Sequence, residues 1–442
     1  MKKLVNIHKQ LFLISLLVII NVNFSAQETK DFSNIKDVFT FAKSQNFSFK
    51  NANDKLKIAE LARKTAIGKV FDPRIPTTIQ TINNTKQQLS FLPGQVFGLP
   101  EGTYKEIAIG QQYISTFSIQ PQFELFNMAN YSQIKTAKIN QKLVENENKI
   151  NEQNLYENIN VVYFNILSFN AQKDIINENI TIAKEILRII NNKFNEGISR
   201  KQEVNEAEVN LIALQDKAEQ IDSNLKIQYQ NLNLFFENEI NSSLSGSVWD
   251  FENSPYNLQT ENNLMVENSI IKNELVHQEY RSLKYQNLPV LSFVSSFNWQ
   301  NLSNDGFFAQ NSDWINFNYL GLKLSYDLPT TVQKFSNIQN KKIQLEIFKN
   351  NELHSQKENE SNNKKMDLEY ERSLYQLENF QKIFNLKKDT YEKNYNQFKE
   401  NILPLDKLLV SQNDMLISKL NVVLSLANIG FNKTKIEINN GF

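Results

Sequence analysis

Two short stretches decide the fold: FNEGI at Phe194–Ile198 and FKENI at Phe398–Ile402, about 204 residues later. Another pair has nearly the same offset, FELFN at Phe123–Asn127 and YDLPT at Tyr326–Thr330. An offset kept over several elements indicates an internal duplication. The sequence therefore predicts two structural repeats, residues 27–245 and 246–442, each running strand, strand, long helix, helix.

Outward from FNEGI the sequence is helical on both sides. Apolar side chains recur at alternating spacings of four and three over 155–194, with Lys173 as the exception, and the pattern resumes over 204–235. Such spacing is typical of coiled coils. Helices are predicted over about 127–195 and 199–238, and over about 330–400 and 404–438 in the second repeat. The first would be roughly 100 Å long at 1.5 Å per residue, so we expect a rod or a tube.

Strands are predicted before each long helix, over about 75–83, 112–126, 288–301 and 315–328. From Tyr113 to Leu125 apolar and polar residues alternate, and stretches 291–299 and 320–328 do the same. This alternation occurs in membrane barrel strands and equally in half-buried strands of soluble proteins, so it leaves both open. The Gly-, Pro- and Asn-rich stretches 83–112 and 301–313 are predicted as water-facing loops.

The first 26 residues have the pattern of a secretory signal peptide. Lys2, Lys3 and Lys9 precede an apolar run from Leu11 to Ile20, and Ala26 offers a small residue at the cut. The run is short for a bilayer span, although a retained membrane anchor is the alternative.

Composition narrows the classes of function. The 48 Lys and Arg balance 48 Asp and Glu, so nucleic acid is not expected as a partner. The chain has no cysteine and three histidines, and it lacks a G-x-x-x-x-G-K phosphate loop. We predict no catalytic residue, no cofactor and no metal, and expect His277 and His354 to be solvated on helix surfaces. A secreted enzyme built around one of them is the weakest alternative.

Four strands cannot seal a barrel in lipid. Open edges would leave backbone groups without hydrogen bonds in hydrocarbon, and the smallest known closed membrane barrels have eight strands. Symmetric assembly of three chains would supply twelve strands and no edge. Because Phe126 and Pro329 pass directly into helical sequence, such a barrel would continue as a helical tunnel.

The duplicated order of elements, the Leu125-Phe126 exit from the strand and the tip FNEGISRKQEVNEAEVNL at 194–211 resemble the TolC-like outer membrane efflux family. The resemblance covers nearly the whole chain after the leader. It implies a mainly helical homotrimer with a small β-barrel part: a 12-stranded barrel in outer-membrane lipid, continued by a coiled-coil tunnel in the periplasm. The implied function is a passive exit duct that receives substrates from an inner-membrane transporter through a periplasmic adaptor.

The resemblance also implies that the two helix tips form the periplasmic end, narrow the pore and contact the adaptor. The candidate residues are Gly197, Ile198, Ser199, Arg200, Glu203, Asn401, Pro404 and Asp406. The second tip departs from the family's pattern, because Asn401 replaces glycine and Asp406 comes one position early. Asp406 is an aperture candidate, and a helix-start acid that interacts with the helix dipole is the alternative.

A different class of protein would share part of this pattern. A secreted, soluble coiled-coil scaffold or binding protein of the cell envelope would have the same leader and heptads. It would not need aromatic-faced strands at the same place in each repeat.

Overall fold

The computed structural model describes residues 29–251, 263–310 and 312–441, so the predicted signal peptide at 1–26 lies outside the described residues. The chain divides into two compact units. The helical unit comprises Met1–Asn53, Asn148–Leu264 and Lys357–Phe442, and the sheet unit comprises Asp54–Glu147 and Met265–Gln356. Each unit takes segments from both sequence repeats, so the repeats are not the units of packing.

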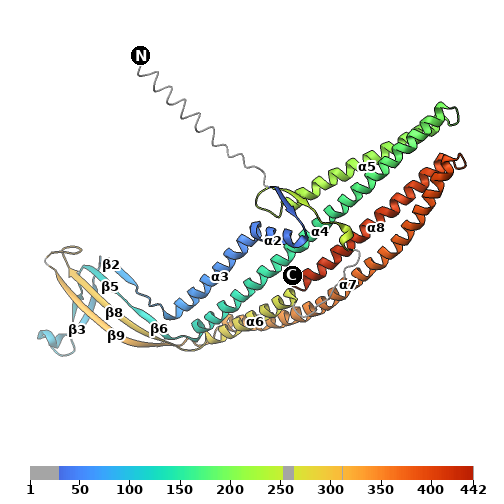
Figure 1. The fold of residues 1–442 in the computed structure, drawn as a ribbon. Coiled ribbons are helices and arrows are strands. Elements are labelled where there is room, and N and C mark those ends of the chain that lie inside the picture. Colours follow the sequence, from blue (N-terminus) through green and yellow to red (C-terminus); the bar gives the residue numbers. More distant parts are fainter. Residues whose placement is uncertain (1–28, 252–262, 311, 442) are drawn as a thin grey trace, which may run out of the picture. The chain divides into compact units, whose positions relative to one another are not determined.

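Four long helices dominate the chain: α4 (Met128–Asn195), α5 (Lys201–Asn233), α7 (Val332–Lys399) and α8 (Leu405–Asn439). Shorter helices are α2 (Ile35–Gln45), α3 (Phe47–Phe71) and α6 (Leu264–Tyr285). In the helical unit α4 and α5 form one helical hairpin, and α7 and α8 form another (Figure 1). The mainly helical fold class with a small sheet contribution is confirmed.

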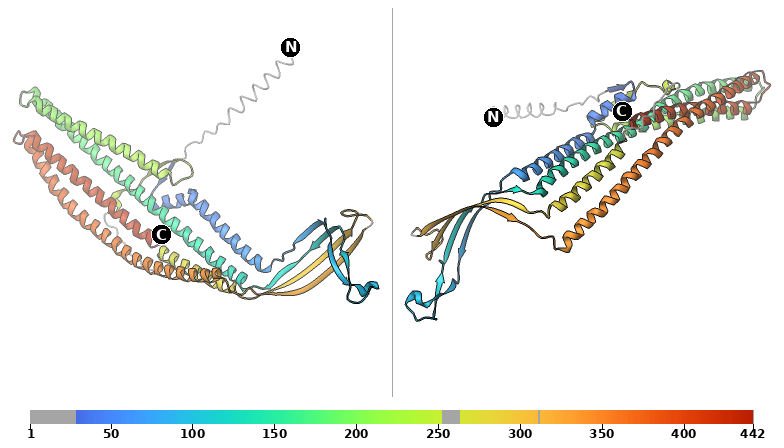
Figure 2. Two further views of the ribbon diagram at one scale, coloured as in Figure 1. Left: turned by 180° about the vertical axis from the view of Figure 1, so that it is seen from behind. Right: turned by 90° about the horizontal axis from the view of Figure 1, so that it is seen from below.

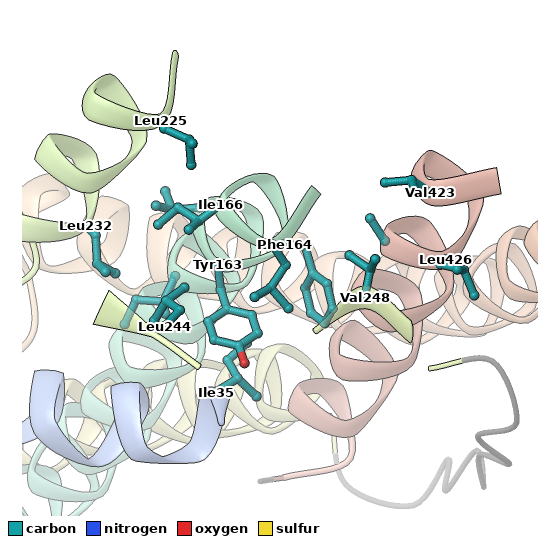
Figure 3. Close-up of a cluster of buried hydrophobic side chains, with 14 of the residues drawn as sticks. Ile35, Tyr163, Phe164, Ile166, Leu225, Leu232, Leu244, Val248, Val423 and Leu426 are labelled. Atoms are coloured by element: carbon teal, nitrogen blue, oxygen red, sulfur yellow. The ribbon is translucent and has the colours of Figure 1, made fainter. Parts of the chain in front are cut away.

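The heptad positions build the core of the helical unit. Ile159, Ile166 and Ile176 on α4 are fully buried, and they belong to one cluster with Leu232 of α5 and Leu426 of α8 (Figure 3). Lys173 interrupts the apolar series, and its Nζ lies 2.7 Å from Asp222 Oδ1 on α5. The one polar heptad position is therefore satisfied by an ion pair between the two arms of the hairpin.

The last helix, α8, is the most buried of the long helices. Among the described residues it alone is long and apolar enough to cross a membrane, and most of its apolar stretch is buried inside the protein. Val422 and Ile429 are buried beside Val423 and Leu426, so both apolar sides of the helix are covered. A helix with apolar residues on two sides packs between neighbours, so α8 is a core helix of this unit.

Smaller elements complete the helical unit. Strand β1 (Thr29–Phe32) pairs in parallel with β7 (Asn241–Leu244), a pairing that the sequence did not predict. Phe32 is fully buried against Phe236 and Phe41. The short 3-10 helix η2 (Val248–Phe251) lies against α8, and its Phe251 ring is 5.1 Å from that of Phe164 on α4.

The sheet unit contains β2 (Thr77–Asn83), β5 (Tyr113–Ile119), β6 (Gln122–Phe126), β8 (Val290–Ser303) and β9 (Asp313–Ser325) in one antiparallel sheet. Strand β5 pairs with β2 on one side and β8 on the other, and β8 also pairs with β6 and β9. Figure 2 shows these strands as one curved sheet.

One strand was predicted over 112–126, but the structure has two, β5 and β6, separated by Gln120 and Pro121. Proline has no N–H to donate to the ladder, so the pairing stops there. The carbonyl of Pro121 still accepts a hydrogen bond from Ser295 N at 3.0 Å. Because β5 and β6 both pair with β8, they act as one ribbon, and the sheet has four ribbons across.

The predicted loop over 83–112 is not simply a loop. It folds into a hairpin of β3 (Gln88–Pro93) and β4 (Tyr104–Ile109), joined by the 3-10 helix η1 (Gly94–Phe97). Pro93, Gly94, Gly98, Pro100 and Gly102, which indicated a loop, lie at the tip of this hairpin, which is why the flanking strands were missed.

The helices of the sheet unit follow the order of the ribbons. Arg63 of α3 lies 3.4 Å from Gln141 of α4, and Lys341 of α7 forms a 2.6 Å ion pair with Glu279 of α6. Between them, the buried Gln278 of α6 donates to Ser132 Oγ of α4 at 2.8 Å. The order is therefore α3, α4, α6, α7, with α3 and α7 at the two ends.

Candidate functional site

The strand pairing sorts the sheet into an apolar and a polar face. Phe117 lies opposite Trp299 with ring centres 5.4 Å apart, and Phe123 stacks on Phe293 at 4.8 Å. On β9 the partners of Phe293 and Leu291 are Leu322 and Leu324. Because paired residues in an antiparallel ladder share a face, the apolar sides predicted for the three stretches join into one surface.

The other face of the sheet is mainly polar. Thr116 pairs with Gln300, and Gln300 Nε2 lies 3.2 Å from Thr116 Oγ1. Ser118 pairs with Asn298 and bonds Thr78 at 2.6 Å between their hydroxyl oxygens. A strand with one face for lipid and one for water is the pattern of a transmembrane barrel strand.

Both edges of the sheet are open. Among the described residues β2 pairs only with β5, and β9 pairs only with β8. Every residue of β2 is exposed, and Leu320, Leu322 and Leu324 of β9 are each about two-thirds exposed. Edge strands with unpaired N–H and C=O groups are templates for pairing with another chain.

The first helix tip joins α4 to α5 through a tight turn. Gly197 N donates to Phe194 O at 3.0 Å and Ile198 N donates to Lys193 O at 2.8 Å. Gly197 has φ 76°, in the left-handed region where glycine carries no steric cost. The backbone N–H of Arg200 donates to Glu203 Oε2 at 3.0 Å, and this hydrogen bond caps the start of α5 at Lys201.

The second tip repeats this geometry between α7 and α8. Asn401 N donates to Phe398 O at 3.2 Å and Ile402 N donates to Gln397 O at 2.9 Å. Asn401 has φ 61°, so asparagine here adopts the left-handed conformation of Gly197. Pro404 precedes the first turn of α8, which holds the exposed Asp406.

One side chain joins the two tips, a contact that was not predicted. Lys193 of α4 donates from Nζ to the backbone oxygen of Phe398 on α7 at 2.8 Å. The same ammonium lies 4.2 Å from the centre of the Phe398 ring. Burial lowers the pKa of Lys193, and the nearby Glu203 acts in the opposite direction.

The structure places all eight candidate residues in these two tips. Ile198 and Ile402 occupy equivalent positions and are both exposed, and Gly197 and Asp406 are also exposed. The Glu203 carboxylate accepts the hydrogen bond from Arg200 N at the start of α5. Their roles at a pore and in contact with a partner stay predictions.

No group of metal-binding side chains is evident in the part of the chain that the structure describes. There, no three His, Cys, Asp or Glu residues are grouped so that they could hold a metal ion. His277 on α6 and His354 on α7 are both exposed. The features that stand out are the open sheet and the paired tips.

Comparison with known proteins finds one matching family and several solved structures of similar fold. The outer membrane efflux protein family matches residues 109–235. No curated protein matches the sequence.

Solved structures share the fold at low sequence identity. The Campylobacter jejuni CmeC outer membrane channel aligns with a TM-score of 0.69 and 14% identity, over 92% of this chain and 85% of that one. CusC aligns with a TM-score of 0.73 and 12% identity, over 92% of both chains. The outer membrane protein VceC of Vibrio cholerae gives 0.65 and 11%, over 92% of this chain and 96% of that one.

The open sheet, the paired helical hairpins and these alignments define the fold of an outer membrane channel subunit. Residues 109–235 match the outer membrane efflux protein family, and the fold of the chain is similar to that of these outer membrane channels.

Proposed function

We propose that the chain is one subunit of a passive, trimeric exit duct in the bacterial outer membrane, extended into the periplasm by its helices. The observation that carries the proposal is the sheet: four ribbons, two open edges and an exposed apolar face. In lipid, each unpaired backbone group at those edges would cost several kcal/mol. Three copies placed edge to edge would remove both edges and give twelve ribbons.

The ends of the helix row support the same closure. On α3, Ile58 and Leu61 are exposed, and on α7 so are Phe335, Ile343 and Ile347. Apolar stripes of this kind mark surfaces that are covered in the assembled protein. Because the α3 and α7 stripes lie at opposite ends of one row, a head-to-tail contact between copies would cover both and could close into a ring.

The tips supply the proposed periplasmic end. The candidate residues at Gly197–Glu203 and Asn401–Asp406 would narrow the pore and contact a periplasmic adaptor, which in turn engages an inner-membrane transporter. Ile198 and Ile402 are exposed apolar side chains at the outermost turn of each hairpin, which suits them to a protein partner.

Cysteine cross-linking tests the ring. The chain has no native cysteine, so Leu61→Cys combined with Ile343→Cys or Ile347→Cys reports the α3–α7 contact without background. We expect covalent species up to three chains on a denaturing gel. Glu60→Cys, exposed but about 100° around the helix from Leu61, is the matched control with the same α7 variants, and we expect a weaker or absent product from it. Only monomers in every pairing would contradict the ring.

Membrane association and conductance separate the duct from a soluble envelope scaffold. A duct stays in outer membranes through a high-salt wash and gives stepwise currents in planar bilayers. A scaffold is released by the wash and gives no current. Replacement of Ile198 or Ile402 by Asp should leave membrane association intact and reduce co-purification of the adaptor.

A further inference from the structure

The β3–β4 hairpin is well built at its tip. Gly94 N donates to Thr103 O at 2.7 Å, and Leu99 N donates to Gly94 O at 3.0 Å. Gly98 and Gly102 have φ of 75° and 85°, which the turns require. A Cβ on Gly94 would lie 2.1 Å from Thr103 Oγ1, so the tip closes tightly around this glycine. The hairpin therefore has a defined shape.

One face of this hairpin is mainly apolar and exposed, with Glu106 as its charged member. Leu89, Phe91 and Tyr104 share this face, because Leu89 pairs with Ala108, Phe91 with Glu106, and Pro93 with Tyr104. All three side chains are at least half exposed. In the described residues β3 and β4 pair only with each other. An isolated two-stranded hairpin is marginal in water, so a surface that packs on this face is expected.

The hairpin arises at an open edge of the sheet. Strand β3 follows directly from edge strand β2, and Asn84 N bonds Gln112 O at 2.7 Å at the root of the hairpin. Figure 2 shows the hairpin projecting away from the ends of β8 and β9. A second copy at the β2 edge would therefore be the first surface that the hairpin reaches.

The opposite edge presents a matching surface at the same end of the sheet. Asn83 pairs with Tyr113, Tyr113 with Ser303, and Leu302 with Asp313, so β2 ends at the level where β9 begins. The connection between β8 and β9 carries Phe308, which is half exposed at φ 57° and lies 6.3 Å from the ring of the half-exposed Trp314. In contrast, Phe307 already packs on Tyr113 of its own chain at 5.0 Å.

We propose that the Leu89–Phe91–Tyr104 face of the hairpin packs on Phe308 and Trp314 of the neighbouring copy, forming a clasp between subunits at the mouth of the barrel. This inference rests on the proposed closure of β9 onto β2 between copies. It assigns the hairpin to a partner of the same sequence, and it explains why two exposed aromatic surfaces lie at opposite edges and at one level.

The test uses two single-cysteine chains produced together, one with Phe91→Cys and an affinity tag, the other with Trp314→Cys and no tag. After reaction with a bismaleimide, we expect the untagged chain to be recovered with the tagged chain on a denaturing gel. The matched control replaces Phe91→Cys by Leu92→Cys, which lies on the other face of the hairpin. A weaker or absent product is expected from it.

A double variant, Phe91→Cys with Trp314→Cys in one chain, tests the two alternatives, a contact within one chain and a contact with the membrane. Cross-linking confined to monomers would show that the hairpin folds on its own connection and would overturn the clasp. Absence of any product, with Phe91→Cys instead labelled by a photoreactive lipid, would assign the face to the membrane and also overturn it. If the α3–α7 pairs form trimers in the same preparation, either failure concerns the clasp alone. If the α3–α7 pairs form no trimers, the result contradicts both the proposed closure and the clasp.

A second readout follows the stability of the assembly. Leu89→Ser with Phe91→Ser should lower the temperature at which trimers dissociate in detergent, whereas Leu92→Ser should change it much less. Equal effects of the two changes would contradict a specific role for the apolar face.

Discussion

Lys193 Nζ lies 2.8 Å from the backbone oxygen of Phe398 and 4.2 Å from the centre of its ring. Lys193 belongs to the last turn of α4 and Phe398 to the last turn of α7, so one side chain joins the two sequence repeats at their tips. Charge-assisted hydrogen bonds are stronger than neutral ones, and burial of the ammonium raises the cost of losing its partner.

This contact predicts that Lys193→Met loosens one tip from the other. The methionine keeps an unbranched apolar stem but has neither the hydrogen bond nor the cation over the ring, a loss of about 1–3 kcal/mol. If the tips narrow the pore, single-channel conductance should rise. Lys201→Met is the control, because Lys201 Nζ lies 5.9 Å from the Phe194 ring within its own tip. Equal conductance in Lys193→Met and wild type would contradict a restraining role.

The left-handed residues of the two tips predict opposite responses to substitution. Gly197→Ala should destabilise the protein by about 1 kcal/mol, because a Cβ there meets no neighbour and only the backbone conformation is disfavoured. Asn401→Gly should be neutral or slightly stabilising, and Asn401→Ala should be destabilising. Thermal unfolding in detergent measures all three. Gly306→Ala, at an open position without positive φ, should have little effect.

The core of the helical unit predicts a larger cost at Gly430. A Cβ there would lie 2.2 Å from Phe164 Cε1 and 3.0 Å from Phe251 Cγ, so the Phe164 ring must move and the Phe251 ring is tightly contacted. We expect Gly430→Ala to destabilise by about 1–3 kcal/mol through overpacking. Phe164→Leu should recover part of that loss in the double variant. Simple additivity of the two costs would show that the contact is not the cause.

Tyr163 predicts a loss of stability in alkali. Burial, with smaller contributions from Asp250 and Asp37, raises its pKa to about 12 from the model-peptide value of 10.0. A raised folded-state pKa means that stability is fully present below pH 10 and is lost as pH rises toward 12. The loss would be roughly 2–3 kcal/mol at 1.36 kcal/mol per pKa unit.

Unfolding followed by circular dichroism from pH 9 to about pH 12 checks this prediction. Tyr163→Phe should lose less stability over that range than the wild type, and the difference isolates Tyr163 from the other tyrosines. Parallel pH profiles for the two proteins would contradict the assigned cause.

Much of the architecture could be predicted from periodicity. The heptad positions of α4 are buried because a 3.5-residue repeat keeps one stripe against its neighbours, and the alternation in β8 and β9 gives their apolar face. Asn401 adopts the left-handed conformation because the duplication places it where Gly197 stands. These features depend on local pattern and on the repeat.

The remaining features depend on contacts between distant segments. Strands β1 and β7 are four residues each and pair across 212 positions, so no local alternation marks them. The hydrogen bond from Lys193 goes to a backbone oxygen, which any residue type would present, and no local pattern pairs Lys193 with the Phe398 ring. The β3–β4 hairpin was missed because its tip is rich in Pro and Gly, although Leu89 and Phe91 already alternate with Ser90.

Mass of the detergent-solubilised protein, with bound detergent subtracted, tests the central claim most directly. The open edges of β2 and β9 predict a particle containing three copies of the chain, stable on dilution. A particle of one chain, retaining the same secondary structure, would contradict the closed barrel and with it the duct.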